Sequence, residues 1–429
     1  MEPWMVLLIV LVVFLLIRMP IAVALALSAT LVLLWTEGAD TAVQLMAQRI
    51  YGVTRSWILL AIPFFMLAGT IMEHGGLTRR IVAFAGAIVG FLPGGLAAVN
   101  VTASMLFGGI TGSASADTSA LGSLLIPAMR RQGYSGPFSA AVTASSSCIG
   151  MIIPPSIPMV LWSFVSGVSL GNLFLGGMLP GLLVGLFQIV ICSIISSRRH
   201  YGERQPFSIK TVAATAKDGV LTLIAPFIII GGIVFGIFTP TEAAIVAVVY
   251  CLFLGMVVYK ELKLRDLPAI LLRAGAMSAM VLFIVAGSTL FSFVLTLMDV
   301  PMLVTEKLLV FGDSPTAFVL ITSLLFLVLG VFMDISVIIL LVGPIIAPLL
   351  LQIGVDPIQV AMIYMVVLAA GLVTPPVGLC LFVASGISRI PVETIARESF
   401  VFVLGILAVA GLIWFVPGLA LWMPSLFGY

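Results

Sequence analysis

A run of small and polar residues, Gly108 to Gly122, interrupts an otherwise strongly apolar chain and most constrains its fold. The chain is 62% hydrophobic and only 8% charged, with a mean hydropathy of +1.31, values typical of a polytopic membrane protein. We expect the glycines of the run to break any helix there. Irregular backbone at membrane depth must line a cavity or be buried in protein, because an unpaired N–H or C=O costs several kcal/mol in hydrocarbon. The hydroxyls and the carboxylate of Asp117 therefore indicate a site for a small ion or polar solute.

The rest of the composition indicates helices in a lipid bilayer. Apolar runs of about 17 to 25 residues recur between short charged turns, a length that predicts helical spans and not barrel strands. The longest polar interval, Ser196 to Asp218, is too short to fold as a soluble domain. The net charge of +2 gives no indication of a nucleic-acid partner. The cysteines lie in apolar segments without paired spacing, so we interpret them as buried apolar side chains and not as disulfides or metal ligands: Cys148, Cys192, Cys251 and Cys380.

Two segments predict scaffold helices. Residues 1–56 are expected to form an N-terminal scaffold helix and an amphipathic connection, with Pro20 either kinking or splitting the apolar stretch 3–36. Residues 198–273 hold two basic loops and the central scaffold helices between them. A further short amphipathic piece is expected at Pro301 to Phe311.

The first repeat, residues 57–197, predicts a re-entrant hairpin followed by a broken helix. The hairpin covers about 100–130, with legs of about ten to twelve residues that are too short to cross the bilayer. The broken helix covers 138–167 and is interrupted at Pro154-Pro155, because proline removes a hydrogen-bond donor and disfavours helical geometry at the residue before it.

The second repeat, residues 274–429, has the same organisation. Its hairpin covers about 316–351 and is broken around Gly330 to Ser336. Its broken helix covers 359–388 and is interrupted at Thr374-Pro375-Pro376. The two repeats keep a nearly constant spacing, which a duplication of hairpin plus broken helix explains. The matching pairs are Pro127 with Pro348, Gly133 with Gly354 and Pro154-Pro155 with Pro375-Pro376 at 221 positions, and Ser166–Ser169 with Ser385–Ser388 at 219.

Lysine and arginine predict the orientation, because they gather in cytoplasmic loops. If Met1 is cytoplasmic and the opening stretch crosses once, fifteen basic residues lie inside and only Arg49, Arg55 and Lys307 lie outside. The first hairpin then enters from the cytoplasm and the second from the opposite side, so the two halves are inverted copies. A double crossing before Trp57 would reverse this bias unless another span were added.

Inverted repeats with re-entrant tips and broken helices predict a secondary transporter with its site at the midplane. Half-helix N-termini attract an anion, while unwound carbonyls and Ser/Thr oxygens suit Na⁺. We expect no cofactor beyond Na⁺ as the coupling ion, and two equivalent sites. The candidates of the first are Gly109, Gly112, Ser113, Ser115, Asp117, Thr118, Ser145, Ser146, Ser147 and Pro154; those of the second are Gly330, Asp334, Ser336, Gly371, Thr374 and Pro375.

Several of these residues also fit purely structural roles. Asp117 and Asp334 could each cap the second leg of a hairpin, and a mid-membrane carboxylate usually has such a partner or a function. Ser145 to Ser147 could be small residues that let helices pack closely. The proline pairs bring no ligand themselves, but they free carbonyls that could coordinate an ion. Both interpretations stay open for each group.

Other classes of function find little support. The chain contains no GxxxxGK[ST] loop, so the energy source must be an ion gradient or a partner protein. An intramembrane enzyme remains a remote alternative, because no HExxH motif and no serine paired with a membrane histidine are present. A channel is also disfavoured, since two separate tips do not form a ring around one pore.

The motifs resemble a known family, the large DctM-like membrane subunit of tripartite ATP-independent periplasmic (TRAP) transporters. The resemblance covers the whole chain. Its most specific parts are Arg18–Ala22, Phe107–Asp117, Ile153-Pro-Pro-Ser156 with Trp162, and Gly371–Gly378.

The resemblance implies a Na⁺-coupled importer of organic acids in the bacterial inner membrane, working by an elevator mechanism. It implies two partners, a small four-helix membrane subunit and a soluble periplasmic binding protein. No small subunit is fused to these 429 residues, so a separate chain is expected. The candidate residues at the two tips carry over as Na⁺ and substrate ligands. The runner-up is a stand-alone Na⁺/carboxylate symporter, and the organic acid itself is not specified by the sequence.

Overall fold

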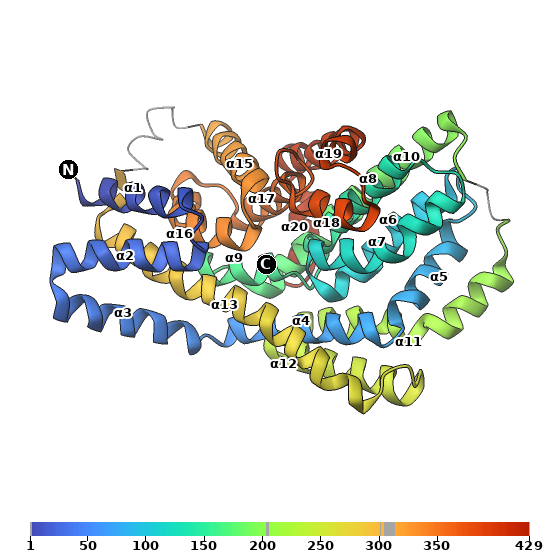
Figure 1. The fold of residues 1–429 in the computed structure, drawn as a ribbon, viewed down its shortest axis with the longest axis horizontal. Coiled ribbons are helices and arrows are strands. Elements are labelled where there is room, and N and C mark those ends of the chain that lie inside the picture. The colour runs from blue at the N-terminus through green and yellow to red at the C-terminus, as the bar shows by residue number, and fades with distance from the viewer. Residues whose placement is uncertain (1, 203–205, 301, 304–313, 429) are drawn as a thin grey trace.

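The computed structural model describes residues 2–202, 206–300, 302–303 and 314–428, and over these ranges it is all-helical without a strand. Figure 1 shows the N-terminal helices gathered at one end of the molecule and the first hairpin and α10 toward the other, with the broken helices between them. The predicted piece at Pro301–Phe311 lies, except for Met302 and Leu303, outside the described residues. The predicted all-α membrane fold is confirmed.

The opening stretch forms two helices, so Pro20 splits it and does not kink it. Helix α1 ends at Leu16, the chain turns through Arg18 with φ of 63°, and α2 starts at Ile21 and packs against α1. The amphipathic connection is a third helix, α3, which packs on α2 and α13. The bounds are α1 Pro3–Leu16, α2 Ile21–Glu37 and α3 Ala39–Thr54.

Long helices surround the two repeats. In the part of the chain that the structure describes, eight helices are long and apolar enough to cross a membrane. Glu242 forms a capping box with Thr239 at the start of α12, which satisfies amides that the helix leaves free. A π-helical turn at 254–258 ends that helix. Two of the eight belong to the second repeat's hairpin, and the other six are α4 Trp57–His74, α10 Leu170–Arg199, α11 Ile209–Val234, α12 Pro240–Phe253, α13 Leu267–Leu297 and α19 Val392–Phe415. Two shorter helices are α5 Leu77–Val89 and α20 Gly418–Leu426.

The first hairpin consists of α6, Gly95–Thr111, and α7, Ala114–Arg131, joined at Gly112-Ser113. Its legs have 17 and 18 residues, so the expectation of legs of ten to twelve residues is wrong. The reason is that Gly108 stays helical: it lies against the backbone of Gly150, where a Cβ would come within 2.2 Å of the Gly150 Cα. The glycines permit close helix packing here, and only Gly112 breaks the helix.

The first broken helix has the predicted interruption. Helix α8, Gly136–Ser147, continues as a 3₁₀ turn to Met151, and the chain then crosses the cis Pro154–Pro155 bond before α9, Ile157–Ser166. The N-cap Ser156 accepts a hydrogen bond from the Met159 N–H at 3.3 Å and donates one to the Met151 carbonyl at 2.5 Å. The backbone freed by the prolines therefore finds partners inside the protein.

The second repeat matches the first element by element. Its hairpin consists of α15, Pro315–Phe332, and α16, Ile335–Ile353; its broken helix consists of α17, Pro357–Gly371, and α18, Leu379–Ser388. The starts of α7 and α16 lie 221 positions apart, as do those of α8 and α17. The Pro375–Pro376 bond is also cis.

One predicted match is out of register. Helices α9 and α18 end at Ser166 and Ser388, 222 positions apart, so the pairing of Ser166 with Ser385 is wrong. The structural counterpart of Ser385 is Ser163. Each of these two serines donates a hydrogen bond of 2.6 Å to the carbonyl five residues further on, Val168 and Ile390.

The second helix of each hairpin packs against the second half of the other repeat's broken helix. Helix α7 of the first hairpin packs against α18 of the second broken helix, and α16 of the second hairpin packs against α9 of the first. An exchange of this kind is what a two-fold axis between the copies produces. The inverted orientation predicted from the sequence requires such an axis.

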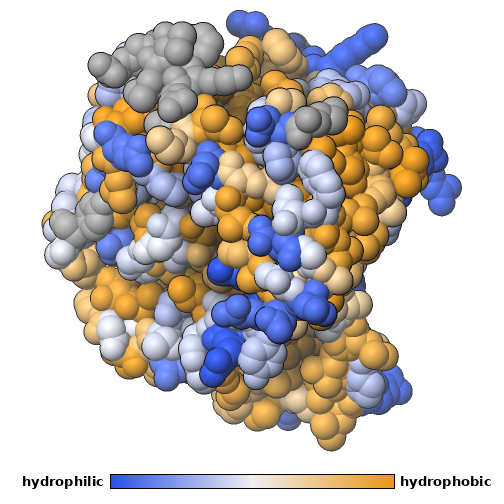
Figure 2. Space-filling view, turned by 90° about the vertical axis from the view of Figure 1, so that its left-hand side faces the viewer, coloured by the Kyte–Doolittle hydropathy of each residue, from blue (hydrophilic) through white to orange (hydrophobic). Residues whose placement is uncertain are grey.

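The surface has the character of a membrane protein. Figure 2 shows the end formed by the N-terminal helices, where hydrophilic residues gather across the middle and along the upper right margin and apolar residues cover much of the rest. Large apolar side chains are exposed along the spans, such as Phe227 (71%) and Leu272 (76%). The four cysteines are free and buried, as predicted.

Two glycines on α13 offer a test of the scaffold packing. A Cβ on Gly287 would lie 2.4 Å from the Ala22 carbonyl oxygen of α2, whereas one on Gly275 meets nothing within 4 Å. We expect Gly287→Ala to lower the free energy of unfolding by about 1–3 kcal/mol through overpacking. Gly275→Ala should leave it unchanged or raise it by up to about 1 kcal/mol through helix propensity. Thermal unfolding in one detergent measures both, and equal effects would contradict the tight α2–α13 contact.

Candidate functional site

Both hairpin tips open onto one cavity of about 370 Å³. The first tip contributes Gly112 to Ser115 and the second contributes Asp334 to Ser336. The broken helices add Met151, Ile157, Pro158, Leu372 and Leu379. The structure therefore brings the two predicted tips to one cavity between the repeats, and two equivalent binding sites stay a prediction.

Four helix N-termini meet at this cavity. Helices α7 and α16 begin at the hairpin tips, and α9 and α18 begin where the broken helices resume. The aligned peptide dipoles of a helix give each N-terminus roughly half a positive charge. The convergence of four such ends creates a region that favours an anion, without any basic side chain among the residues that line the cavity.

Asp334 is the one charged side chain lining the cavity. It is the N-cap of α16, and its Oδ1 accepts a hydrogen bond from the Ser336 N–H at 2.8 Å. The capping interpretation is confirmed for this residue. Its counterpart 221 positions earlier is Ser113, the N-cap of α7, and not Asp117. The two aspartates are therefore not equivalent, contrary to the expectation of two equivalent sites.

Asp117 is fully buried in the first turns of α7 and does not cap it. Its Oδ1 accepts a hydrogen bond from the Thr111 hydroxyl. Its Oδ2 has no hydrogen-bond partner among the described residues and points to Gly150, where a Cβ would come within 2.2 Å of it. A buried carboxylate oxygen without a donor has room in its coordination for a cation or a proton.

The serines before the first break lie behind the cavity and are buried. Ser146 shares a hydrogen bond of 2.8 Å with Ser104, and Ser147 donates one of 2.8 Å to the Thr143 carbonyl. The Ser145 hydroxyl has no partner among the described residues, while its carbonyl accepts from Gln188 at 3.0 Å. The contacts with Ser104 and Gln188 tie α8 to α6 and α10, so helix packing explains Ser146, whereas the Ser147 hydroxyl bonds within its own helix.

The two breaks differ in their surroundings. Pro154 is buried, and its carbonyl lies beside Gly109 of α6. Pro375 is exposed, and Thr374 is half-buried with its hydroxyl on the Ala370 carbonyl at 2.7 Å. Neither proline lines the cavity.

The hairpins are held to the breaks by backbone contacts. The Ile157 N–H donates to the Gly112 carbonyl at 3.4 Å, and the Gly378 N–H donates to the Val331 carbonyl at 3.2 Å. Gly330 and Gly371 pack backbone to backbone. Of the predicted candidates, those that line the cavity are Gly112, Ser113, Ser115, Asp334 and Ser336, and those that lie behind it are Gly109, Asp117, Thr118, Ser145, Ser146, Ser147, Pro154, Gly330, Gly371, Thr374 and Pro375.

A methionine-rich wall was not anticipated from the sequence. Met277, Met280 and Ile284 of α13 and Met66 of α4 close the cavity on the scaffold side. Their spacing of three to four residues along α13 places them on one face of the helix. That spacing is visible in the sequence, but nothing in it says which element this face meets.

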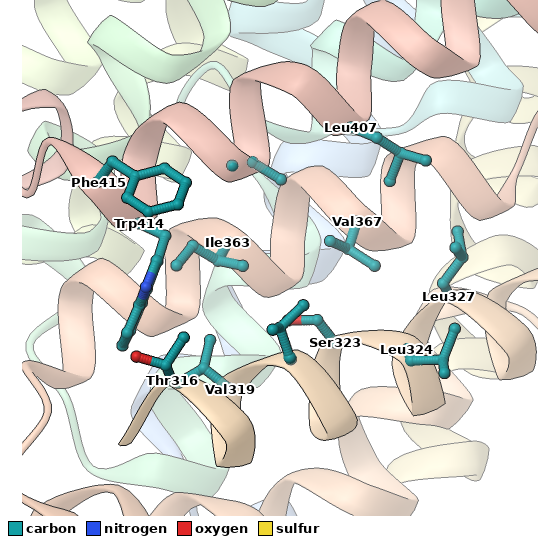
Figure 3. Close-up of a pocket in the computed structure, with 13 residues that line it drawn as sticks. Thr316, Val319, Ser323, Leu324, Leu327, Ile363, Val367, Leu407, Trp414 and Phe415 are labelled. Carbon is teal, nitrogen blue, oxygen red and sulfur yellow. The ribbon is translucent and has the colours of Figure 1, made fainter. Parts of the chain in front are cut away.

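A separate groove of about 310 Å³ lies between α15, α17 and α19 (Figure 3). Apolar side chains line it together with Thr316 and Ser323, and no charged side chain does. In the first repeat, Met105 of α6 packs against Gly185 of α10. The counterpart of Gly185 in the second repeat, 222 positions later, is Leu407 of α19, which lines the groove. The groove is thus a gap where the repeats differ, without the polar groups a carboxylate needs.

The comparisons with known proteins agree with this architecture. The family model "Tripartite ATP-independent periplasmic transporter, DctM component" matches residues 8–419. The chain belongs to the DctM family. It is similar to the C4-dicarboxylate TRAP transporter large permease protein DctM of Pseudomonas aeruginosa, with 37% identity over 90% of each chain. It is equally similar to the sialic acid TRAP transporter large permease protein SiaM of Vibrio cholerae, with 37% identity over 96% of each chain.

A solved structure shares the fold of this DctM-family chain. The YdaH transporter of Alcanivorax borkumensis aligns with a TM-score of 0.63 at 15% identity, over 92% of this chain and 90% of that one. The family and its relatives make this chain the large permease subunit of a secondary transporter for organic acids, a multi-pass membrane protein and not an enzyme.

The first tip of this permease can be tested with two glycines of positive φ. Gly112 has φ of 60° and would place a Cβ 2.8 Å from the Pro155 carbonyl oxygen; Gly133 has φ of 84° and nothing within 4 Å. Gly133→Ala should cost only the left-handed strain, about 1–2 kcal/mol. Gly112→Ala should cost about 1–3 kcal/mol more, because the tip must move off the break. Thermal unfolding of the two variants measures the difference, and equal losses would contradict the close contact.

Proposed function

We propose that this chain is the permease subunit of a Na⁺-coupled importer that receives organic acids from a periplasmic binding protein. The observation that carries the proposal is the single cavity between the two hairpin tips. Four helix N-termini favour a carboxylate there, while Asp334 at the rim opposes it. A bound cation would relieve that repulsion, so the cavity favours an anion and a cation together over either alone.

Na⁺ is the cation that these groups suit. Hydroxyls, freed carbonyls and carboxylates are hard oxygen ligands, and unwound backbone beside a half-helix end is the usual place for Na⁺ in transporters. The unpaired Oδ2 of Asp117 and the unpaired hydroxyl of Ser145 lie behind the first tip. No group of three or more His, Cys, Asp or Glu side chains suited to a metal occurs among the described residues. The proposed ligands are therefore mostly hydroxyl and backbone oxygens.

The proposal includes an elevator mechanism, which two features support. The α1–α3 helices form an apolar core with α13 that is separate from the core containing the hairpins and broken helices. Methionines of α4 and α13 face the tip cavity. Flexible thioethers tolerate changing neighbours, which suits a sliding contact.

The proposal includes two partners and a location. The DctM family and the TRAP relatives support a separate small membrane subunit, a periplasmic binding protein and the bacterial inner membrane. The two relatives carry different acids in their names at the same identity of 37%. The proposal therefore names organic acids as a class.

Reconstitution tests the function directly. The chain is placed in proteoliposomes with its small subunit, and uptake of a radiolabelled C4-dicarboxylate and a sialic acid is measured. We expect uptake of one acid to require both an inward Na⁺ gradient and the binding protein. Uptake that persists without the binding protein would instead favour a stand-alone Na⁺/carboxylate symporter. Uptake driven by ATP alone, or no dependence on Na⁺, would reject both.

The charge of Asp334 can be separated from its capping role. Asparagine caps helices as well as aspartate, so Asp334→Asn should leave thermal stability within about 0.5 kcal/mol. Because the charge is lost, the Na⁺ concentration for half-maximal uptake should rise about tenfold, which corresponds to about 1.4 kcal/mol. Asp356→Asn is the matched control, since Asp356 caps α17 and does not line the cavity. An unchanged Na⁺ dependence for Asp334→Asn would remove this residue from the proposed cation site.

A further inference from the structure

A second cavity of about 170 Å³ leads away from the tip cavity. The two cavities share four lining residues, Met66, Ser113, Ser115 and Met277, so they are adjacent. The second cavity lies between the scaffold helices α4 and α13 and the first hairpin. It extends along α4 to Glu73 and back along α13 to Arg273.

This cavity leads toward the basic side of the protein. Arg273 lies near the start of α13, just after the connection that carries Lys260, Lys263 and Arg265. Basic connections mark the cytoplasmic side of a membrane protein. Thr70, Thr111 and Ser119 give the walls hydroxyl groups on the way. The second cavity thus has the position and the polar lining of a path for a solute between the tips and the cytoplasm.

Arg273 is the one basic side chain among the residues that line the two cavities. It forms a single ion-pair contact with Glu73, Nη1 to Oε2 at 3.4 Å, and the two side chains are 48% and 32% exposed. A pair this exposed contributes only about 0–1 kcal/mol, so a competing anion can displace Glu73 at little cost. A guanidinium has five donors in a planar fork that matches a carboxylate in two parallel hydrogen bonds.

We propose that Arg273 is a docking site for the substrate carboxylate on the cytoplasmic path, and that Glu73 competes with the substrate for it. The inference rests on the proposed transport of organic acids. The carboxylate leaves the helix N-termini at the tips and exchanges with Glu73 on Arg273. Glu73 then re-forms its ion pair with the guanidinium, and the acid is released.

The two members of the pair should have opposite effects on transport. Vesicles are loaded with increasing labelled C4-dicarboxylate or sialic acid, whichever the wild type carries, and efflux is measured for molecules whose basic loops face the lumen. Arg273→Gln should raise the half-saturating concentration on that side about tenfold. Glu73→Gln should lower it at least threefold and slow release at saturation. Arg273→Lys should fall between wild type and Arg273→Gln, since lysine keeps the charge without the fork.

A purely structural ion pair would behave differently. In that case Glu73→Gln and Arg273→Gln would shift the half-saturating concentration in the same direction, or not at all, and the inference would be wrong. The matched control is the pair Arg80–Glu261, at 2.8 Å, which lines neither cavity. Arg80→Gln and Glu261→Gln should leave the half-saturating concentration unchanged. A wild type that carries no organic acid would instead reject the proposed function, so the two failures are distinguishable.

Discussion

The need to pair every backbone N–H and C=O inside a membrane determines how this protein can hold a site at mid-depth. A helix that stops within hydrocarbon leaves up to four donors or acceptors free at each end, and each costs several kcal/mol unless it finds a partner. Here the ends of the hairpin legs and of the broken helices meet. The Gly112 and Val331 carbonyls accept from the resumed halves, and Ser156 takes up the Met151 carbonyl.

The duplicated architecture does not make two equal sites. The first break is buried behind α6 and α10, with Asp117 enclosed between α7 and Gly150. The second break is exposed at Pro375, and its hairpin presents Asp334 to the cavity. The first repeat therefore buries its carboxylate, Asp117, whereas the second repeat places its carboxylate, Asp334, at the cavity. A pair of copies that meet on a two-fold axis can in this way divide the roles of a single site between them.

Much of this could be predicted from the sequence because proline, glycine and spacing have direct physical meanings. The proline pairs can only interrupt a helix, and a constant offset of 221 positions can only come from repeated elements. The length of the hairpin legs could not be predicted. A glycine such as Gly108 fits a loop, and it also fits a helix that another backbone approaches closely. Here Gly150 makes that approach, which is a tertiary contact and cannot be read from the local sequence. The suggested capping role holds for Asp334 and not for Asp117, since capping depends on where α7 and α16 begin.

The second cavity, the proposed substrate path, could be predicted least, because it lies between elements that are distant in the sequence. Arg273 follows a basic loop and resembles a topology signal, and Glu73 ends an ordinary span. Only the packing of α4 against both α13 and α6 places this pair on the same cavity as Ser113 and Ser115. A carboxylate held by helix N-termini alone meets diffuse positive charge, which weakens within a turn of the helix. In the proposed path, Arg273 lies further along and extends the attraction for a carboxylate toward the basic side of the protein. Because Glu73 pairs with it, the two side chains together add no net charge.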